Sequence, residues 1–122
     1  MVNILHVEEH EEERLAARQW WSVGVTYAER FFKSLSQFDV HQVSPEYVIN
    51  LQMCYIQFER LPFPAVVKRA RETMLNSMYA FIMAAHAALS GDEDKARQAI
   101  NKAFAGLLQV KKELSPLGIE LK

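Results

Sequence analysis

Apolar residues recur every three or four positions along most of the chain, which is the spacing of one face of an α-helix. The clearest case is a heptad seam made of Ala17, Trp21, Gly24, Ala28, Phe31, Leu35 and Phe38. Further apolar side chains flank this seam at Trp20, Val25, Tyr27 and Phe32. An apolar surface wider than one seam indicates a helix that faces two neighbouring helices. We expect this helix to span residues 7–37.

Four short segments of turn-forming and capping residues divide the rest of the chain. Ser44-Pro45 is typical of an N-cap followed by the first helical position. Pro62-Phe63-Pro64 interrupts a helix, because proline donates no amide hydrogen and restricts the residue before it. In Ser90-Gly91-Asp92, glycine suits the end of one helix and aspartate caps the next. Ser115-Pro116 then ends the last helix.

These breaks predict an all-α fold, because no segment shows the strict apolar and polar alternation of a strand. The expected architecture is an up-and-down bundle of four helices at about 7–37, 45–60, 64–89 and 92–114. We expect a single domain, 1–122, with short tails at 1–6 and 117–122. Apolar side chains surround the third helix from Met74 onward, which predicts that this helix is buried.

Residues 80–108 resemble a single tetratricopeptide-type helical hairpin. The small residue Ala84 precedes the glycine turn at Gly91, and Ala96, Ile100 and Ala103 follow at the family's small, aromatic and small positions. The resemblance implies two antiparallel helices packed around small side chains. One repeat period upstream, the corresponding residues are Asn50, Gln57, Pro62 and Arg69. Because the pattern does not recur, the sequence predicts one hairpin rather than a solenoid, which needs about three repeats.

Composition narrows the choice of partners and compartment. The chain has 122 residues, of which 50% are hydrophobic, a formal charge of −1 and a pI near 6.4. This balance gives no overall electrostatic attraction to nucleic acid or to anionic membranes. Cys54 is the only cysteine, the N-terminus lacks the pattern of a secretory signal, and no uncharged apolar run approaches about 20 residues. We therefore expect a cytoplasmic protein with no membrane partner.

Residues able to bind metal are few. His6 and His10 lie four positions apart in an acidic segment and could share a helical face, but the sequence fixes no third ligand. Di-iron bundles use Glu-x-x-His, and neither His41 nor His86 has a glutamate three residues earlier. We predict no metal, no cofactor and no catalytic residue, which favours a non-enzymatic function.

The favoured function is a protein–protein interaction module that pairs with itself as a homodimer or with another helical protein. Adjacent residues on a helix point about 100° apart, so one of the two neighbouring tryptophans can fill the core while the other faces a second surface. Trp20 and Tyr27 are the predicted partner-binding residues, because they share that second face.

Two alternatives stay open. Tyr79, Met83 and His86 could line an interior pocket for a small molecule, with His86 as a candidate general base. Lys68, Arg69 and Arg71 could form a basic patch for a nucleic-acid accessory protein, although neighbouring acidic residues dilute the charge.

Overall fold

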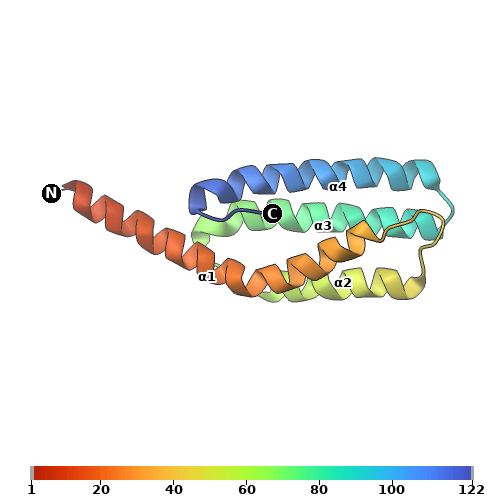
Figure 1. Cartoon of the computed structure of the whole chain (residues 1–122), viewed down its shortest axis with the longest axis horizontal. Coiled ribbons are helices and arrows are strands. Elements are labelled where there is room, and N and C mark those ends of the chain that lie inside the picture. Colours follow the sequence, from red (N-terminus) through yellow and green to blue (C-terminus); the bar gives the residue numbers. More distant parts are fainter. Residues whose placement is uncertain (1, 122) are drawn as a thin grey trace.

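Four long helices make up most of the protein (Figure 1). The computed structural model describes the backbone of residues 2–121 and the side chains of residues 11–121. The helices are α1 (Val2–Ser36), α2 (Pro45–Arg60), α3 (Lys68–Leu89) and α4 (Glu93–Leu114), with short 3-10 turns η1 (Ala65–Val67) and η2 (Ser115–Leu117). Residues 2–121 contain no strand, so the predicted all-α bundle is confirmed. No helix in this range has the length and apolar character needed to cross a membrane.

The helix boundaries follow the capping chemistry of the sequence. The Ser44 hydroxyl accepts a hydrogen bond from the Tyr47 amide at 3.2 Å, and Asp92 accepts one from the Lys95 amide at 3.1 Å. Gly91 has a φ of 80°, the left-handed conformation that glycine adopts without steric cost. The predicted starts and ends of α2 and α4 are therefore correct to within one residue.

Three expected boundaries differ from the structure. The predicted tail at residues 1–6 is wrong for residues 2–6, because the helix begins at Val2 and no proline or glycine interrupts it there. The third helix begins with the 3-10 turn η1, so its α-helical part starts at Lys68 rather than 64. The C-terminal segment is not a loose tail, since Gly118 reverses the chain at a φ of 79° and Ile119 is buried.

The antiparallel pair α3 and α4 makes the most extensive contact in the bundle. The two helices approach closely because small residues face each other. A Cβ atom added at Gly106 would lie 2.9 Å from the Cβ of Ser77. The Ser77 hydroxyl donates a buried hydrogen bond of 2.6 Å to the Ala103 carbonyl. The predicted hairpin therefore exists, although its likeness to a particular repeat family stays a prediction.

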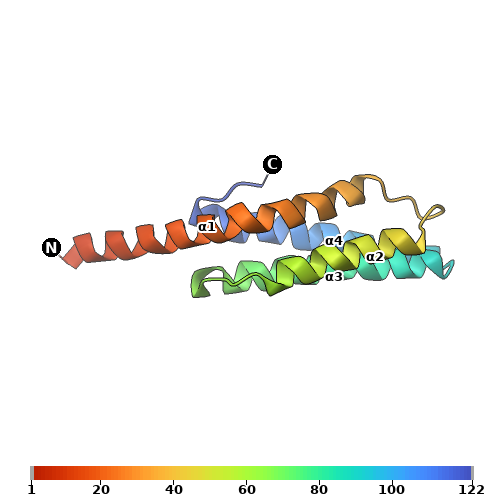
Figure 2. The ribbon, with the colours of Figure 1, turned by 90° about the horizontal axis from the view of Figure 1, so that it is seen from below.

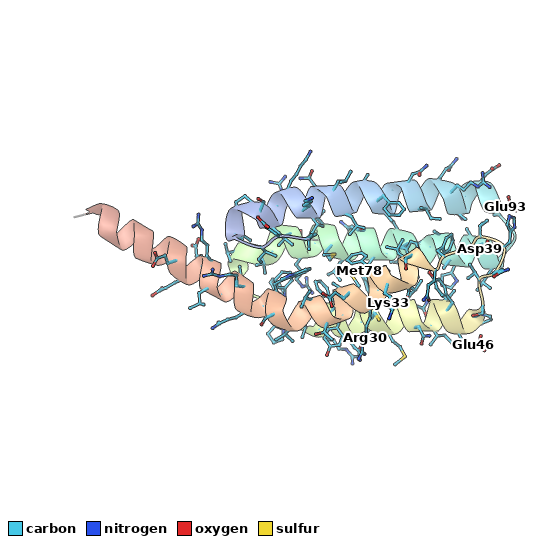
Figure 3. The ribbon with its side chains drawn as sticks, viewed as in Figure 1. Arg30, Lys33, Asp39, Glu46, Met78 and Glu93 are labelled. Atoms are coloured by element: carbon cyan, nitrogen blue, oxygen red, sulfur yellow. The ribbon has the colours of Figure 1, made fainter. Side chains whose placement is uncertain are left out.

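Aromatic side chains join α1 and α2 to the rest of the bundle. Trp20 of α1 meets Phe58 of α2 edge to face, with ring centroids 5.6 Å apart. Phe31 and Phe38 contact Phe81 of α3, with ring centroids 5.6 and 5.3 Å from that of Phe81. Met78, labelled in Figure 3, is fully buried, whereas Lys33 is exposed. Such edge-to-face pairs stabilise a core beyond the area that they bury.

Helix α1 is longer than its neighbours and projects past the end of the bundle (Figure 1). The described side chains of residues 11–15 are all exposed, and burial begins at Ala17. In the rotated view, α2 and α3 share one layer, and α1 and α4 form the other (Figure 2). Close backbone contact joins α1 to α2 and α2 to α3, but hardly joins α1 to α4.

Candidate partner-binding groove

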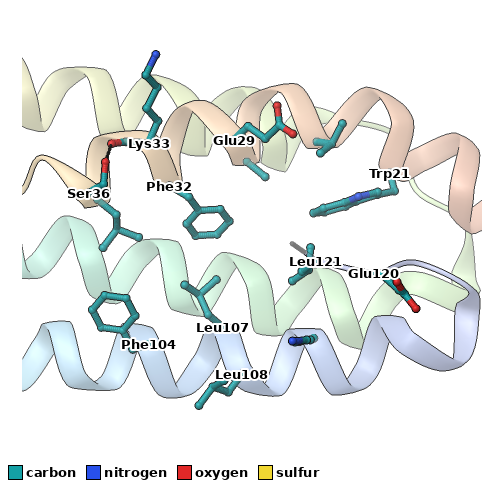
Figure 4. A pocket seen from close by; sticks show the side chains of 14 residues that line it. Trp21, Glu29, Phe32, Lys33, Ser36, Phe104, Leu107, Leu108, Glu120 and Leu121 are labelled. Carbon is teal, nitrogen blue, oxygen red and sulfur yellow. Dashed lines mark hydrogen bonds between the residues drawn. The ribbon is translucent and has the colours of Figure 1, made fainter.

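An apolar groove of about 1010 Å³ lies between α1 and α4. Figure 4 shows Trp21 and Phe32 of α1 on one side, Leu107 and Leu108 of α4 on the other, and Leu121 of the C-terminal segment between them. The remaining lining residues are Val25, Ala28, Glu29, Lys33, Leu35, Ser36, Phe104, Lys111 and Glu120. The groove exists because α1 packs closely on α2 and α4 packs closely on α3, whereas α1 and α4 make little close backbone contact with each other.

The α1 wall is a heptad seam that shares Trp21, Ala28 and Leu35 with the seam predicted from the sequence. Its residues are Trp21, Val25, Ala28, Phe32 and Leu35, spaced alternately by four and three. The core-facing side of the same helix carries Ala17, Trp20 and Phe31. One helix therefore presents apolar side chains in two directions, as its unusual apolar width predicted.

The α4 wall leaves large apolar side chains in solvent. Phe104 is 50% exposed and Leu108 is 65% exposed, while Leu107 between them packs against the core. Single exposed apolar residues are ordinary, but a continuous apolar strip on facing helices is typical of a binding surface. This strip is the strongest candidate site in the described chain.

Charged side chains of both signs lie around the groove. Glu29 and Lys33 belong to α1, Lys111 to α4, and Glu120 to the C-terminal segment. None of these four side chains forms an ion pair with another residue whose side chain the structure describes. The rim can therefore offer both charges to a partner.

The two tryptophans occupy positions opposite to those expected, with Trp20 in the core and Trp21 at the groove. Trp20, predicted to face a partner, is only 6% exposed and packs on Phe58. Tyr27, its predicted companion, is half-buried against the core. Trp21 lines the groove instead. The two indole rings stay in contact, with centroids 5.8 Å apart, and packing on Phe58 of α2 places Trp20 in the interior.

The residues of the predicted interior pocket lie on the outside of α3. Tyr79 is 55% exposed, His86 is exposed, and Met83 is half-buried between them. The imidazole of His86 meets the side-chain amide of Gln52 at 3.2 Å, which joins α3 to α2 at the surface. An interior pocket lined by these three residues is therefore wrong. The helix is buried on most sides, as predicted, but it keeps one solvent-facing stripe.

That stripe had a sequence signal. Glu72, Asn76, Tyr79, Met83 and His86 follow the four-and-three spacing of one helical face, and none of them is fully buried. The polar members mark the exposed side of the helix. The many alanines around His86 obscured this pattern.

The basic residues Lys68, Arg69 and Arg71 have different surroundings in the structure. Arg69 pairs with Glu113 at 3.3 Å. Arg71 donates to the Glu59 carbonyl at 2.8 Å and lies 4.2 Å above the Phe63 ring, where it fastens the proline-containing connection to α2. Arg71 therefore has a structural role, while the Arg69 side chain stays exposed although it is paired.

Chemically reactive groups are scarce among the described side chains. Burial raises the pKa of the Cys54 thiol against the opposing effect of Arg30, so the thiol stays protonated at neutral pH. Burial, followed by the charge of Glu59, also raises the pKa of Tyr55. Residues 11–121 hold no group of three potential metal ligands, and the side chains of His6 and His10 lie outside the described residues.

Comparison with known proteins identifies no similar protein. No protein-family model, no curated protein and no solved structure matches the chain. The class that the fold and groove define is an all-α bundle with an apolar groove on one side.

Proposed function

We propose that this protein is an interaction module that binds an amphipathic helix in the groove between α1 and α4. The observation that carries the proposal is the open apolar strip on two adjacent helices that hardly touch each other. An amphipathic helix bound in such a groove would contact both of its walls, which is a recurrent mode of protein recognition.

The dimensions of the groove support a helical partner. On α1 the lining runs from Trp21 to Ser36, which corresponds to about 22 Å, or four turns, at about 1.5 Å per residue. Four turns place apolar residues of a partner at i, i+3 or i+4, i+7 and beyond, enough to meet the exposed parts of Phe104 and Leu108. Burying this strip would supply hydrophobic free energy at about 25 cal/mol per Å².

Trp21 offers a direct reporter of binding. Replacing Trp20 by Phe leaves Trp21 as the single tryptophan, and within the described residues the Trp20 indole N–H has no hydrogen-bond acceptor to lose. The single-tryptophan protein is titrated with synthetic amphipathic helical peptides of about four turns. We expect saturable binding with a blue shift of the Trp21 emission, since a docked peptide removes water from its ring.

Two substitutions distinguish binding in the groove from nonspecific hydrophobic association. Leu108→Glu places a charge in the apolar strip and should abolish the saturable shift. Val23→Glu changes another exposed apolar residue that does not line the groove, and it should leave binding unchanged. Peptide binding that Leu108→Glu does not weaken, or failure of every amphipathic peptide to bind, would contradict the proposal.

A further inference from the structure

We infer that the exposed face of α2 is the contact surface of a homodimer, in which α2 packs antiparallel against α2 of a second copy. The residues of this contact do not line the groove between α1 and α4, so the inference goes beyond the proposed function and does not depend on it. It rests on an exposed apolar strip and on two opposite charges placed symmetrically about the centre of that strip.

Helix α2 carries large apolar side chains on its solvent-facing side. Ile49 and Met53 are each 53% exposed, and Ile56 is 42% exposed. Their spacing of four and three residues places them on one helical face, the α2 strip. The core-facing side of the same helix supplies the buried residues Val48, Leu51 and Phe58. A helix that is apolar on two sides is typical of one that has neighbours on both.

A tyrosine of α3 adds to the apolar surface beside this strip. The ring of Tyr79 is exposed and lies 6.5 Å, between centroids, from the half-buried ring of Tyr55 in α2. Helices α2 and α3 share one layer of the bundle (Figure 2). Exposed apolar side chains gathered on one side of a protein mark an interaction site more often than isolated ones do.

Opposite charges lie at the two ends of the α2 strip. Glu46 is seven residues before Met53, and Arg60 is seven residues after it. Seven residues make about two turns, so all three side chains lie on the same face of the helix. Glu46 and Arg60 are exposed, and neither forms an ion pair with another side chain in residues 11–121. The strip therefore has an acidic end and a basic end at equal distances from its centre.

This symmetry matches an antiparallel pair of α2 helices. With the two-fold axis at Met53, Glu46 lies opposite the partner's Arg60, and Arg60 lies opposite the partner's Glu46. In the same register, Ile49 lies within one residue of the partner's Ile56, or about 1.5 Å along the helix. The axis forms each contact twice and closes the assembly at two copies, as in most homodimers.

A parallel pair of α2 helices lacks this complementarity. In register, it would place Glu46 against the partner's Glu46 and Arg60 against the partner's Arg60. Like charges at both ends disfavour it, as does the parallel alignment of the two helix dipoles. The charges therefore favour the antiparallel arrangement.

Cysteine crosslinking tests the orientation. Cys54 is the only cysteine, so Cys54→Ala gives a cysteine-free background. On it, Met53→Cys places two thiols beside the two-fold axis, and oxidised glutathione should produce a disulfide-linked dimer. Ile49→Cys is the matched control on the same face. Its two copies lie about 12 Å apart along the helices, beyond the roughly 7 Å between Cα atoms that a disulfide spans. Equal crosslinking at both positions, as a parallel pair requires, would overturn the inference.

A charge exchange tests the pairing of the helix ends. The dimer dissociation constant of the whole protein is measured by analytical ultracentrifugation for the wild type, Glu46→Arg, Arg60→Glu and the double variant. Each single variant places like charges together at two symmetric positions and should weaken the dimer about ten-fold. The double variant restores opposite charges and should recover most of that loss. Asp94→Arg and Lys112→Glu make the same charge changes at exposed positions in the first and last turns of α4, and should leave the constant unchanged.

The outcomes distinguish this inference from the proposed function. Met53→Glu should dissociate the dimer and leave the peptide titration of the groove unchanged, whereas Leu108→Glu should do the reverse. A wild-type monomer at every concentration reached, or a dimer insensitive to both single charge variants, would overturn the inference. Dissociation by Leu108→Glu rather than by Met53→Glu would also overturn it. Circular dichroism of each variant confirms that the helices remain folded.

Discussion

Gly106→Ala should destabilise the protein, although alanine is the better helix former. Gly106 lies inside α4, where replacing glycine by alanine normally stabilises a helix by about 1 kcal/mol. Here the new Cβ would lie 2.9 Å from the Cβ of Ser77 and 3.4 Å from its Cα. Rotation of the Ser77 side chain moves neither atom, so α3 and α4 have to separate.

The net effect follows from two opposing magnitudes. Overpacking in a closely packed interior costs about 1–3 kcal/mol, and the gain in helix propensity offsets about 1 kcal/mol of that. We expect Gly106→Ala to lower the free energy of unfolding by about 1 kcal/mol. Ala105→Gly, at the neighbouring exposed position, measures the propensity difference in the same turn of α4.

Urea denaturation followed by circular dichroism measures these changes. With a slope of about 1–3 kcal/mol per molar, a loss of about 1 kcal/mol lowers the midpoint by roughly half a molar. Combining Gly106→Ala with Ser77→Gly removes the clashing Cβ, so the double-mutant cycle should show a favourable coupling of about 1 kcal/mol or more. A Gly106→Ala protein as stable as the wild type would refute the close approach of α3 and α4.

Three further predictions concern stability. Phe81→Ala removes a fully buried ring between Phe31 and Phe38 and should cost about 3–5 kcal/mol in urea denaturation, whereas Phe104→Ala at the half-exposed groove wall should cost far less. Asp92→Ala removes the cap of α4 and should lower the free energy of unfolding by about 1 kcal/mol, and an unchanged midpoint would show that the cap contributes nothing. Burial raises the pKa of the Tyr47 hydroxyl, which donates to the Ser34 carbonyl at 2.6 Å, from 10.0 to about 12. The folded state disfavours the ionised form of Tyr47, so the contribution of the protonated hydroxyl to the free energy of unfolding is present below pH 10 and is lost as the pH rises toward 12. The wild type should therefore lose stability more steeply than Tyr47→Phe between these two pH values.

The fold could be predicted where local chemistry decides it. Several helix ends depend only on interactions between residues close in sequence: the Ser44 cap, the prolines at 62 and 64 and the turn at Gly91. The predicted ends of α2 and α4 are accordingly correct to within one residue. The start of α1 was misjudged, because residues 2–6 contain neither a cap signal nor a breaker at the true boundary. Ile119 is buried because the chain reverses at Gly118, and the spacing of apolar residues does not predict that reversal.

The candidate site could be predicted only in part. The width of the apolar surface on α1 correctly indicated a second face on that helix. Trp20 and Trp21 are adjacent, however, and periodicity alone does not decide which of them meets Phe58. The α4 wall was missed because Phe104 and Leu108, although they share one helical face, lie on a charged helix, and the sequence does not show that α1 lies beside that face.

The separation of α1 from α4 also implies that the helices differ in local stability. The α3 and α4 pair makes the most extensive contact in the bundle, whereas α1 makes close backbone contact mainly with α2. Helices with fewer buried contacts open at lower free energy than the core. Amide hydrogens of α1 should therefore exchange with solvent before those of α3, and the hairpin would persist as the last folded unit. A helix that detaches first is also the helix most readily exchanged between two copies.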